Sequence, residues 1–174
     1  SVEIGNPEFH KSVKPVRYEK GSPDATELTP GQISQVRGAL GSLTWMATHW
    51  RPDLAAQSSL ALQSLPRPTV LDAKKVNDVV KRARQDPGMT VTLRPVPIKN
   101  LTVFGCSDAS LGNAKRKSTQ AGFLVSMGDV QISWGIEGLW SPISWKSYRL
   151  RRVVASTFGA ETQAALNCAR EVMW

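Results

Sequence analysis

The stretch at residues 101–127, LTVFGCSDASLGNAKRKSTQAGFLVSM, decides the fold class. Residues 101–107 are mostly apolar or β-branched, a composition typical of a buried strand. Residues 121–127 have the same character, and the basic segment between the two predicts the tip of a β-hairpin. Residues 142–145 predict a third strand. This part of the chain is therefore expected to begin with an antiparallel sheet.

A helix is expected to follow the sheet, over residues 154–174. Ser156 or Thr157 can accept a backbone N–H bond as its cap. The side chains expected on its inner side are Ala160, Glu161, Ala164, Ala165, Cys168 and Val172. Two hairpin strands, a third strand and a helix indicate the α/β class, in its α+β form.

Upstream, residues 29–88 predict a small three-helix module. Thr29 and Gln32 have the spacing of a capping box, with Pro30 at the first helical position. Pro52 can open a second helix, and Thr69 with Asp72 can cap a third. The apolar positions expected to face the module's interior are Ile33, Val36, Leu40, Leu43, Ala47, Leu54, Ser58, Leu62, Leu65, Val76, Val79, Val80 and Ala83. Short connections favour compact packing of these helices.

The remaining segments predict little regular structure. Residues 1–28 contain three prolines and two glycines among polar residues, which favours an irregular lead-in. Residues 89–100, with Pro95 and Pro97, are expected to link the two modules.

The charge balance favours a polyanionic partner. The 22 Lys and Arg exceed the 14 Asp and Glu, which leaves a net charge of +8. The third helix alone carries Lys74, Lys75, Lys81, Arg82 and Arg84. The first four are candidates for contacts with a nucleic-acid backbone, and a solvated polar face is the alternative.

Several functional classes are not favoured by the sequence. No run approaches the roughly 18 to 20 apolar residues of a membrane span, and no secretion signal is visible. Cys106 and Cys168 lack the CxxC and histidine pattern of a zinc site, so both are expected to be buried free thiols. The expected location is therefore intracellular, either cytoplasmic or nuclear.

Two carboxylates are candidates for chemistry. Asp108 ends the first predicted strand and Glu161 lies early in the last predicted helix. If both faced one side, they could hold Mg²⁺ or Mn²⁺, which can activate water against a phosphodiester. The alternatives are a turn or cap residue at Asp108 and a helix-dipole interaction at Glu161.

Four blocks of sequence resemble the polyprotein of copia-type retrotransposons. SDASLGN (107–113) with RKSTQAGF (116–123), PISWKS (142–147) and VVASTFGAET (153–162) are similar to motifs of the first half of its RNase H domain. VRGALGSL (36–43) and RPDL (51–54) resemble the segment that closes its reverse transcriptase.

This resemblance implies a connection or thumb-like reverse transcriptase module at residues 29–88 and a partial RNase H-like domain at residues 101–174. Asp108 and Glu161 would be catalytic residues and metal ligands, and Mg²⁺, or Mn²⁺, would support cleavage of the RNA strand of an RNA–DNA hybrid. The residues that would contact phosphates in the RNase H-like part are Lys115, Arg116, Lys117, Lys146, Arg149, Arg151 and Arg152.

The chain also departs from the family's pattern. The family's further metal-binding Asp residues would follow Trp174, so this chain is expected to bind metal weakly and not to cleave by itself. Gly159 and Thr162 replace a Glu and a Tyr of the family. Two alternatives to the nuclease remain open: a basic nucleic-acid-binding module without hydrolysis, and a subunit of a larger protein assembly.

An apparent insertion at residues 129–140 bears on the second alternative. Its apolar side chains are Trp134, Ile136, Leu139 and Trp140. They are expected to form either part of the core or an exposed patch for a partner.

Overall fold

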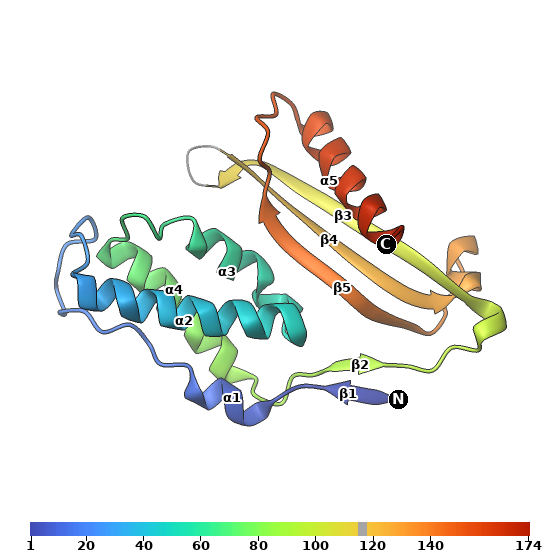
Figure 1. The fold of residues 1–174 in the computed structure, drawn as a ribbon, viewed down its shortest axis with the longest axis horizontal. Helices are drawn as coiled ribbons and strands as arrows, with labels where there is room; N and C mark the ends of the chain where they lie inside the picture. Colours follow the sequence, from blue (N-terminus) through green and yellow to red (C-terminus); the bar gives the residue numbers. More distant parts are fainter. Residues whose placement is uncertain (115–117) are drawn as a thin grey trace. The chain divides into compact units, whose positions relative to one another are not determined.

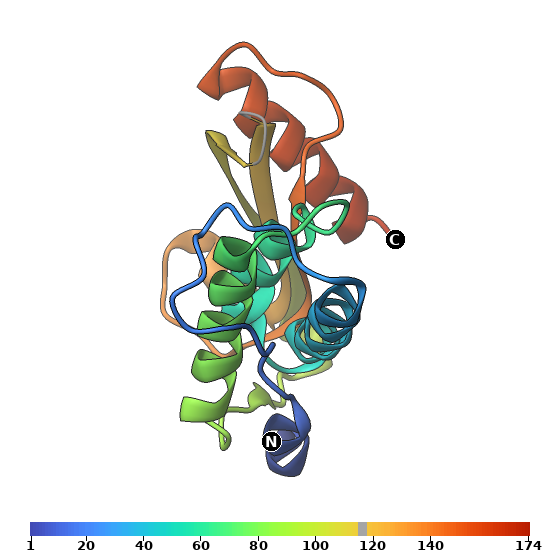
Figure 2. The ribbon, with the colours of Figure 1, turned by 90° about the vertical axis from the view of Figure 1, so that its left-hand side faces the viewer.

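The computed structural model describes residues 1–114 and 118–174, and these residues form two compact units (Figure 1). One unit comprises residues 5–89 and is helical, as Figure 2 also shows. The other comprises residues 1–4 and 90–174 and contains antiparallel sheets with one long helix. The chain therefore belongs to the α+β class. In the described ranges, no helix is long and apolar enough to cross a membrane.

The helical unit contains the expected helices, α2 (Pro30–His49), α3 (Ala55–Leu62) and α4 (Val70–Gln85). A short 3-10 helix, η1 (Pro52–Leu54), precedes α3. Both predicted capping boxes are confirmed: the side chains of Gln32 and Asp72 accept hydrogen bonds at 2.9 Å from the backbone N–H groups of Thr29 and Thr69. Most of the expected inner side chains of α2 and α4 are buried, which explains why these two segments pack as helices.

The lead-in is more ordered than its composition indicates. β1 (Val2–Ile4) pairs antiparallel with β2 (Val91–Leu93), and α1 (Pro7–Ser12) begins at a cap in which Asn6 accepts a bond from the N–H of Phe9. The prediction of irregular structure was therefore wrong for these residues. Beyond α1, Val13, Val16 and Leu28 are buried, so the lead-in contributes to the core through tertiary packing that turn residues do not reveal.

Arg51 is the largest fully buried side chain of the helical unit. Its Nε and Nη2 donate to both carboxylate oxygens of Asp53, at 2.8 and 2.9 Å, and its Nη1 donates to the carbonyls of Ala83 and Asp86. This one guanidinium joins the turn before η1 to the end of α4.

The second unit contains a three-stranded antiparallel sheet in the order β3-β4-β5. The strands are β3 (Leu101–Ala114), β4 (Ser118–Asp129) and β5 (Trp140–Arg149), so the three predicted strands are confirmed and are longer than expected. The segment expected to be a linker contains β2 and η2 (Ile98–Asn100), and the backbone N–H of Arg94 donates to Ser141 Oγ of β5 at 2.7 Å.

Helix α5 (Thr157–Val172) covers one face of this sheet (Figure 1). Ser156 caps it, as predicted, by accepting a bond from the N–H of Gly159 at 3.1 Å. The buried cluster between sheet and helix consists of Ala109, Ala121, Leu150, Ala160 and Ala164. At Gly105 of β3, an added Cβ would lie 2.5 Å from Cys168 Sγ, so only glycine permits this close approach.

Some burial predictions were wrong. Cys106 is exposed while Cys168 is buried. In the apparent insertion, which contains η4 (Val130–Trp134), the side chains of Trp134, Ile136, Leu139 and Trp140 are 70%, 55%, 47% and 45% exposed. These four side chains are therefore exposed and do not form a core.

Candidate functional site

Asp108 lies on the face of the sheet opposite α5. Its neighbour Ala109 pairs with Ala121 of β4, and both belong to the cluster under α5. Successive residues of a strand project to opposite faces, so Asp108 projects from the other face, where it is exposed.

Glu161 is partly buried on α5, directly after Ala160, which packs on the covered face. The structure therefore does not bring the two carboxylates to one face of the sheet, as a shared magnesium ion would require. Within the described ranges, no group of three or more His, Cys, Asp or Glu side chains is arranged to hold a metal ion. The positions of Asp108 and Glu161 on the two sides of the sheet do not favour a shared ion, and metal binding at these two residues stays a prediction.

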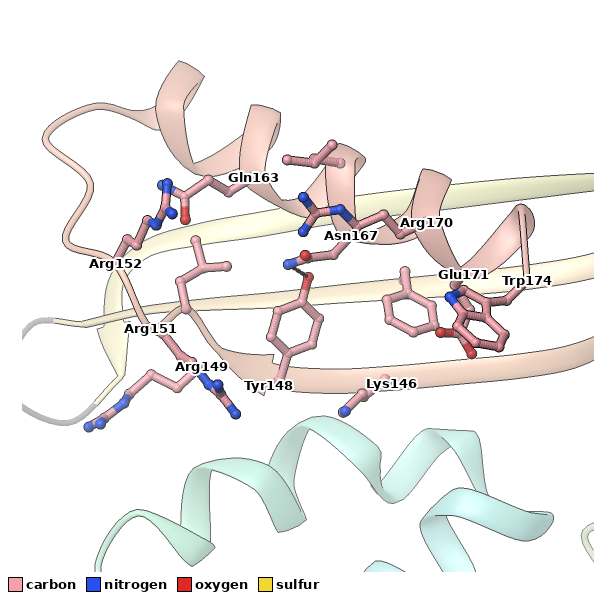
Figure 3. A pocket seen from close by; sticks show the side chains of 13 residues that line it. Lys146, Tyr148, Arg149, Arg151, Arg152, Gln163, Asn167, Arg170, Glu171 and Trp174 are labelled. Carbon is pink, nitrogen blue, oxygen red and sulfur yellow. Dashed lines mark hydrogen bonds between the residues drawn. The ribbon is translucent and has the colours of Figure 1, made fainter.

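A groove of about 850 Å³ runs between β5 and α5 (Figure 3). We refer to it as the basic groove. Its lining residues are Phe123, Lys146, Tyr148, Arg149, Leu150, Arg151, Arg152, Gln163, Leu166, Asn167, Arg170, Glu171 and Trp174.

The local structure explains why these side chains meet. Lys146 and Tyr148 are two residues apart in β5, so they share the face that α5 covers. On the helix, Gln163, Asn167 and Arg170 recur at spacings of four and three, which places them on one side. Alternate residues of a strand and one stripe of a helix thus form part of the groove, and residues 149–152, at the end of β5 and just after it, add to its lining.

Cations dominate the charge of the basic groove. Five of its lining residues, Lys146, Arg149, Arg151, Arg152 and Arg170, are Lys or Arg, and Glu171 is its only carboxylate. Glu171 accepts a hydrogen bond from Ser144 Oγ at 2.7 Å. None of the ion pairs found in the described part of the chain involves these five cations. Their charges are thus available to an anionic ligand.

Tyr148 and Asn167 face each other across the groove, as Figure 3 shows. Asn167 Nδ2 donates to Tyr148 Oη at 2.8 Å. Burial raises the pKa of Tyr148 and outweighs the opposite effect of this hydrogen bond. Tyr148 therefore remains a neutral phenol that can donate its own proton to a ligand.

The predicted phosphate contacts have different outcomes. Lys146, Arg149, Arg151 and Arg152 line the same groove, and their contact with phosphates stays a prediction. The other cations predicted near the hairpin tip, Lys115, Arg116 and Lys117, lie outside the described residues.

The four phosphate contacts predicted on α4 belong to the helical unit. Lys74 pairs with Asp24 at 2.7 Å, and Arg82 pairs with Asp53 at 3.4 Å. Lys75 and Lys81 are exposed on the helix surface. Two of the four predicted contacts on α4 are thus already engaged within the unit.

Four groove residues, Tyr148, Gln163, Asn167 and Arg170, were not predicted from the sequence. The signal that could have found them is the helical spacing of the last three, opposite a strand in which Lys146 and Tyr148 share a face. An argument from charge selects Lys and Arg and does not select neutral polar residues.

In comparisons with known proteins, no family model, curated protein or solved structure matches the chain.

Proposed function

We propose that the sheet-containing unit binds nucleic acid through the basic groove. The observation that carries this proposal is a groove lined by five cations and a single carboxylate. None of the five cations takes part in an ion pair found among the described residues. Lys and Arg that contact phosphates release condensed counterions, and this release supplies most of the affinity of sequence-independent binding. A nucleic-acid ligand also agrees with an intracellular location, cytoplasmic or nuclear.

The resemblance to copia-type polyproteins supports an RNA–DNA hybrid as the ligand. Its motifs include Lys146 of the basic groove and the segment that leads into α5. On this proposal the chain is related to the RNase H region of a retrotransposon, and the helical unit is related to the end of its reverse transcriptase.

Binding can be tested by fluorescence anisotropy of a labelled RNA–DNA hybrid over a range of salt concentrations. Replacing Arg151, Arg152 and Arg170 together by Gln should weaken binding and make the salt dependence shallower, by about 0.9 in log–log slope for each phosphate that the variant no longer neutralises. Lys99→Gln removes one exposed charge of the same unit outside the groove and should leave the slope nearly unchanged. Equal slopes for the triple variant and the wild type would contradict the proposal.

Hydrolysis of the hybrid is a weaker proposal because it depends on the resemblance alone. It would use Mg²⁺ or Mn²⁺ at Asp108 and Glu161, whose positions on the two sides of the sheet do not favour a shared ion. The test is cleavage of a labelled hybrid with Mg²⁺ by the wild type and by Asp108→Asn. Loss of cleavage in the variant would support a role for Asp108, and equal cleavage would remove it from the mechanism.

Membership of a larger protein assembly is the second candidate function. The exposed apolar side chains of Trp134, Ile136, Leu139 and Trp140 favour it, because exposed apolar patches often mark protein interfaces. Purification from the native source should then recover the chain in a stable complex without nucleic acid. A double variant, Trp134→Ser with Ile136→Ser, should release it from that complex.

A further inference from the structure

We infer that the basic groove takes an unpaired strand of nucleic acid, with a base placed against the ring of Tyr148. The inference rests on the proposed nucleic-acid binding and specifies which form of the ligand enters the groove. It concerns only the unit of residues 1–4 and 90–174, because every lining residue belongs to that unit.

The groove contains aromatic rings as well as cations. Phe123 and Tyr148 are partly exposed, and their ring centroids lie 6.1 Å apart with a tilt of 57° between the planes. This tilt leaves the two rings unstacked on each other. Trp174 adds a third ring, which is fully exposed. Proteins that bind single strands combine a basic groove with aromatic side chains on which bases stack, and that is the combination present.

The polar side chains of the groove favour the same ligand. Asn167 holds the Tyr148 hydroxyl at 2.8 Å and so fixes the orientation of the ring. The side-chain amides of Gln163 and Asn167 can both donate and accept hydrogen bonds. The edges of an unpaired base are free to bind such groups, whereas in a duplex these edges are already paired.

The arrangement of charge fits a backbone that follows the groove. In Figure 3, Arg152 lies near Gln163 at one end, and Arg170 lies beside Asn167 further along α5. Lys146 precedes Tyr148 in β5 and lies on the side of Tyr148 away from Arg152. A duplex could reach these cations with its phosphates, but its stacked bases would gain nothing from the rings. The rings therefore distinguish an unpaired strand from a paired one.

The test compares a blunt RNA–DNA hybrid with the same hybrid carrying an unpaired extension of about ten nucleotides. The extension should strengthen binding roughly tenfold for the wild type. Tyr148→Phe keeps the ring but loses the hydroxyl that Asn167 holds, so it should keep most of this gain. Tyr148→Leu keeps the apolar bulk and the charge of the groove but removes the ring, so the ratio of its affinities for the extended and the blunt hybrid should fall to about one. Phe158→Leu, which removes an 81% exposed ring outside the groove, is the matched control and should behave as the wild type.

The possible outcomes separate the two proposals. If the blunt hybrid binds and the extension adds nothing, or if Tyr148→Leu keeps the full gain, the inference is overturned and the proposed function stands. If neither probe binds, the proposed function fails as well. If circular dichroism shows that Tyr148→Leu is unfolded, the wild-type protein can instead be photocrosslinked to an extension that contains 5-iodouracil. An adduct at Tyr148 supports the inference, and adducts only outside the groove overturn it.

Discussion

Replacing Arg51 by Met should destabilise the helical unit strongly. The side chain of Arg51 is fully buried, and it donates to both oxygens of Asp53 and to the carbonyls of Ala83 and Asp86. Met has similar length and no charge, so it fills much of the space and leaves these acceptors without their donor. The Asp53 side chain is only 18% exposed. Its carboxylate would therefore remain charged in a poorly hydrated place.

The size of the expected loss in the free energy of unfolding follows from these contacts. Removing one partner of a buried ion pair typically costs about 3–5 kcal/mol. Water can reach Asp53 in part, and the carbonyl of Ala83 keeps its contact with His10 Nδ1 at 3.0 Å, so the lower end of that range applies. We expect a loss of about 3 kcal/mol in the free energy of unfolding.

The matched control is Arg82→Met, which removes the other arginine that contacts Asp53. Arg82 is 49% exposed and lies 3.4 Å from the carboxylate, so its loss should cost less than about 1 kcal/mol. Urea unfolding can be followed by the NMR signal of the Trp50 indole N–H, which donates to His10 and so reports on the helical unit. A loss for Arg51→Met no larger than that for Arg82→Met would refute this account.

Three further predictions concern pH, packing and thiol reactivity. Burial, with the nearby charge of Arg51, lowers the pKa of His10, so as pH falls the unfolded chain binds a proton at His10 before the folded chain does. The free energy of unfolding should therefore fall as pH drops below about 6.5 and level off below the folded-state pKa of His10. The variant His10→Gln should not show this fall. Gly105→Ala should cost about 1–3 kcal/mol in thermal unfolding because its Cβ would meet Cys168, whereas Gly38→Ala in open space should not destabilise. Cys106 should react with a thiol reagent in the folded state, and Cys168, buried and with its pKa raised by that burial, should react only after unfolding; equal rates would contradict this.

The parts of the fold that depend on local chemistry could be predicted from the sequence. The two capping boxes at Thr29 and Thr69 locate the starts of α2 and α4, since a cap is decided by residues three positions apart. The order of three strands and a helix was predicted in the same way, from apolar segments separated by turn residues.

The parts of the fold that depend on contacts between residues distant in the sequence could not be predicted. The side chain of Asn77 in α4 accepts from the N–H of Val16 at 2.7 Å and donates to its carbonyl at 2.9 Å, which fixes part of the lead-in. Arg51 likewise acts through Ala83 and Asp86, which are distant in the sequence. Nothing in the local sequence around residues 13–16 or 51 indicates these partners.

The hypothesis of a magnesium site depended on a face of β3 that periodicity did not indicate, because β3 is not a simple alternation of apolar and polar residues. The small residues of β3 indicate instead which of its faces packs against α5. Gly105 and Ala109 are four apart and therefore share a face, and that face receives the small residues of α5. Asp108 must then lie on the other face. Bringing it under α5 would require a one-residue shift of β3, which would move Ala109 out of the cluster and turn the carboxylate toward Ala160 and Ala164. Such a shift would bury a charge against apolar side chains, and the cost of that burial favours the register in which Asp108 is exposed.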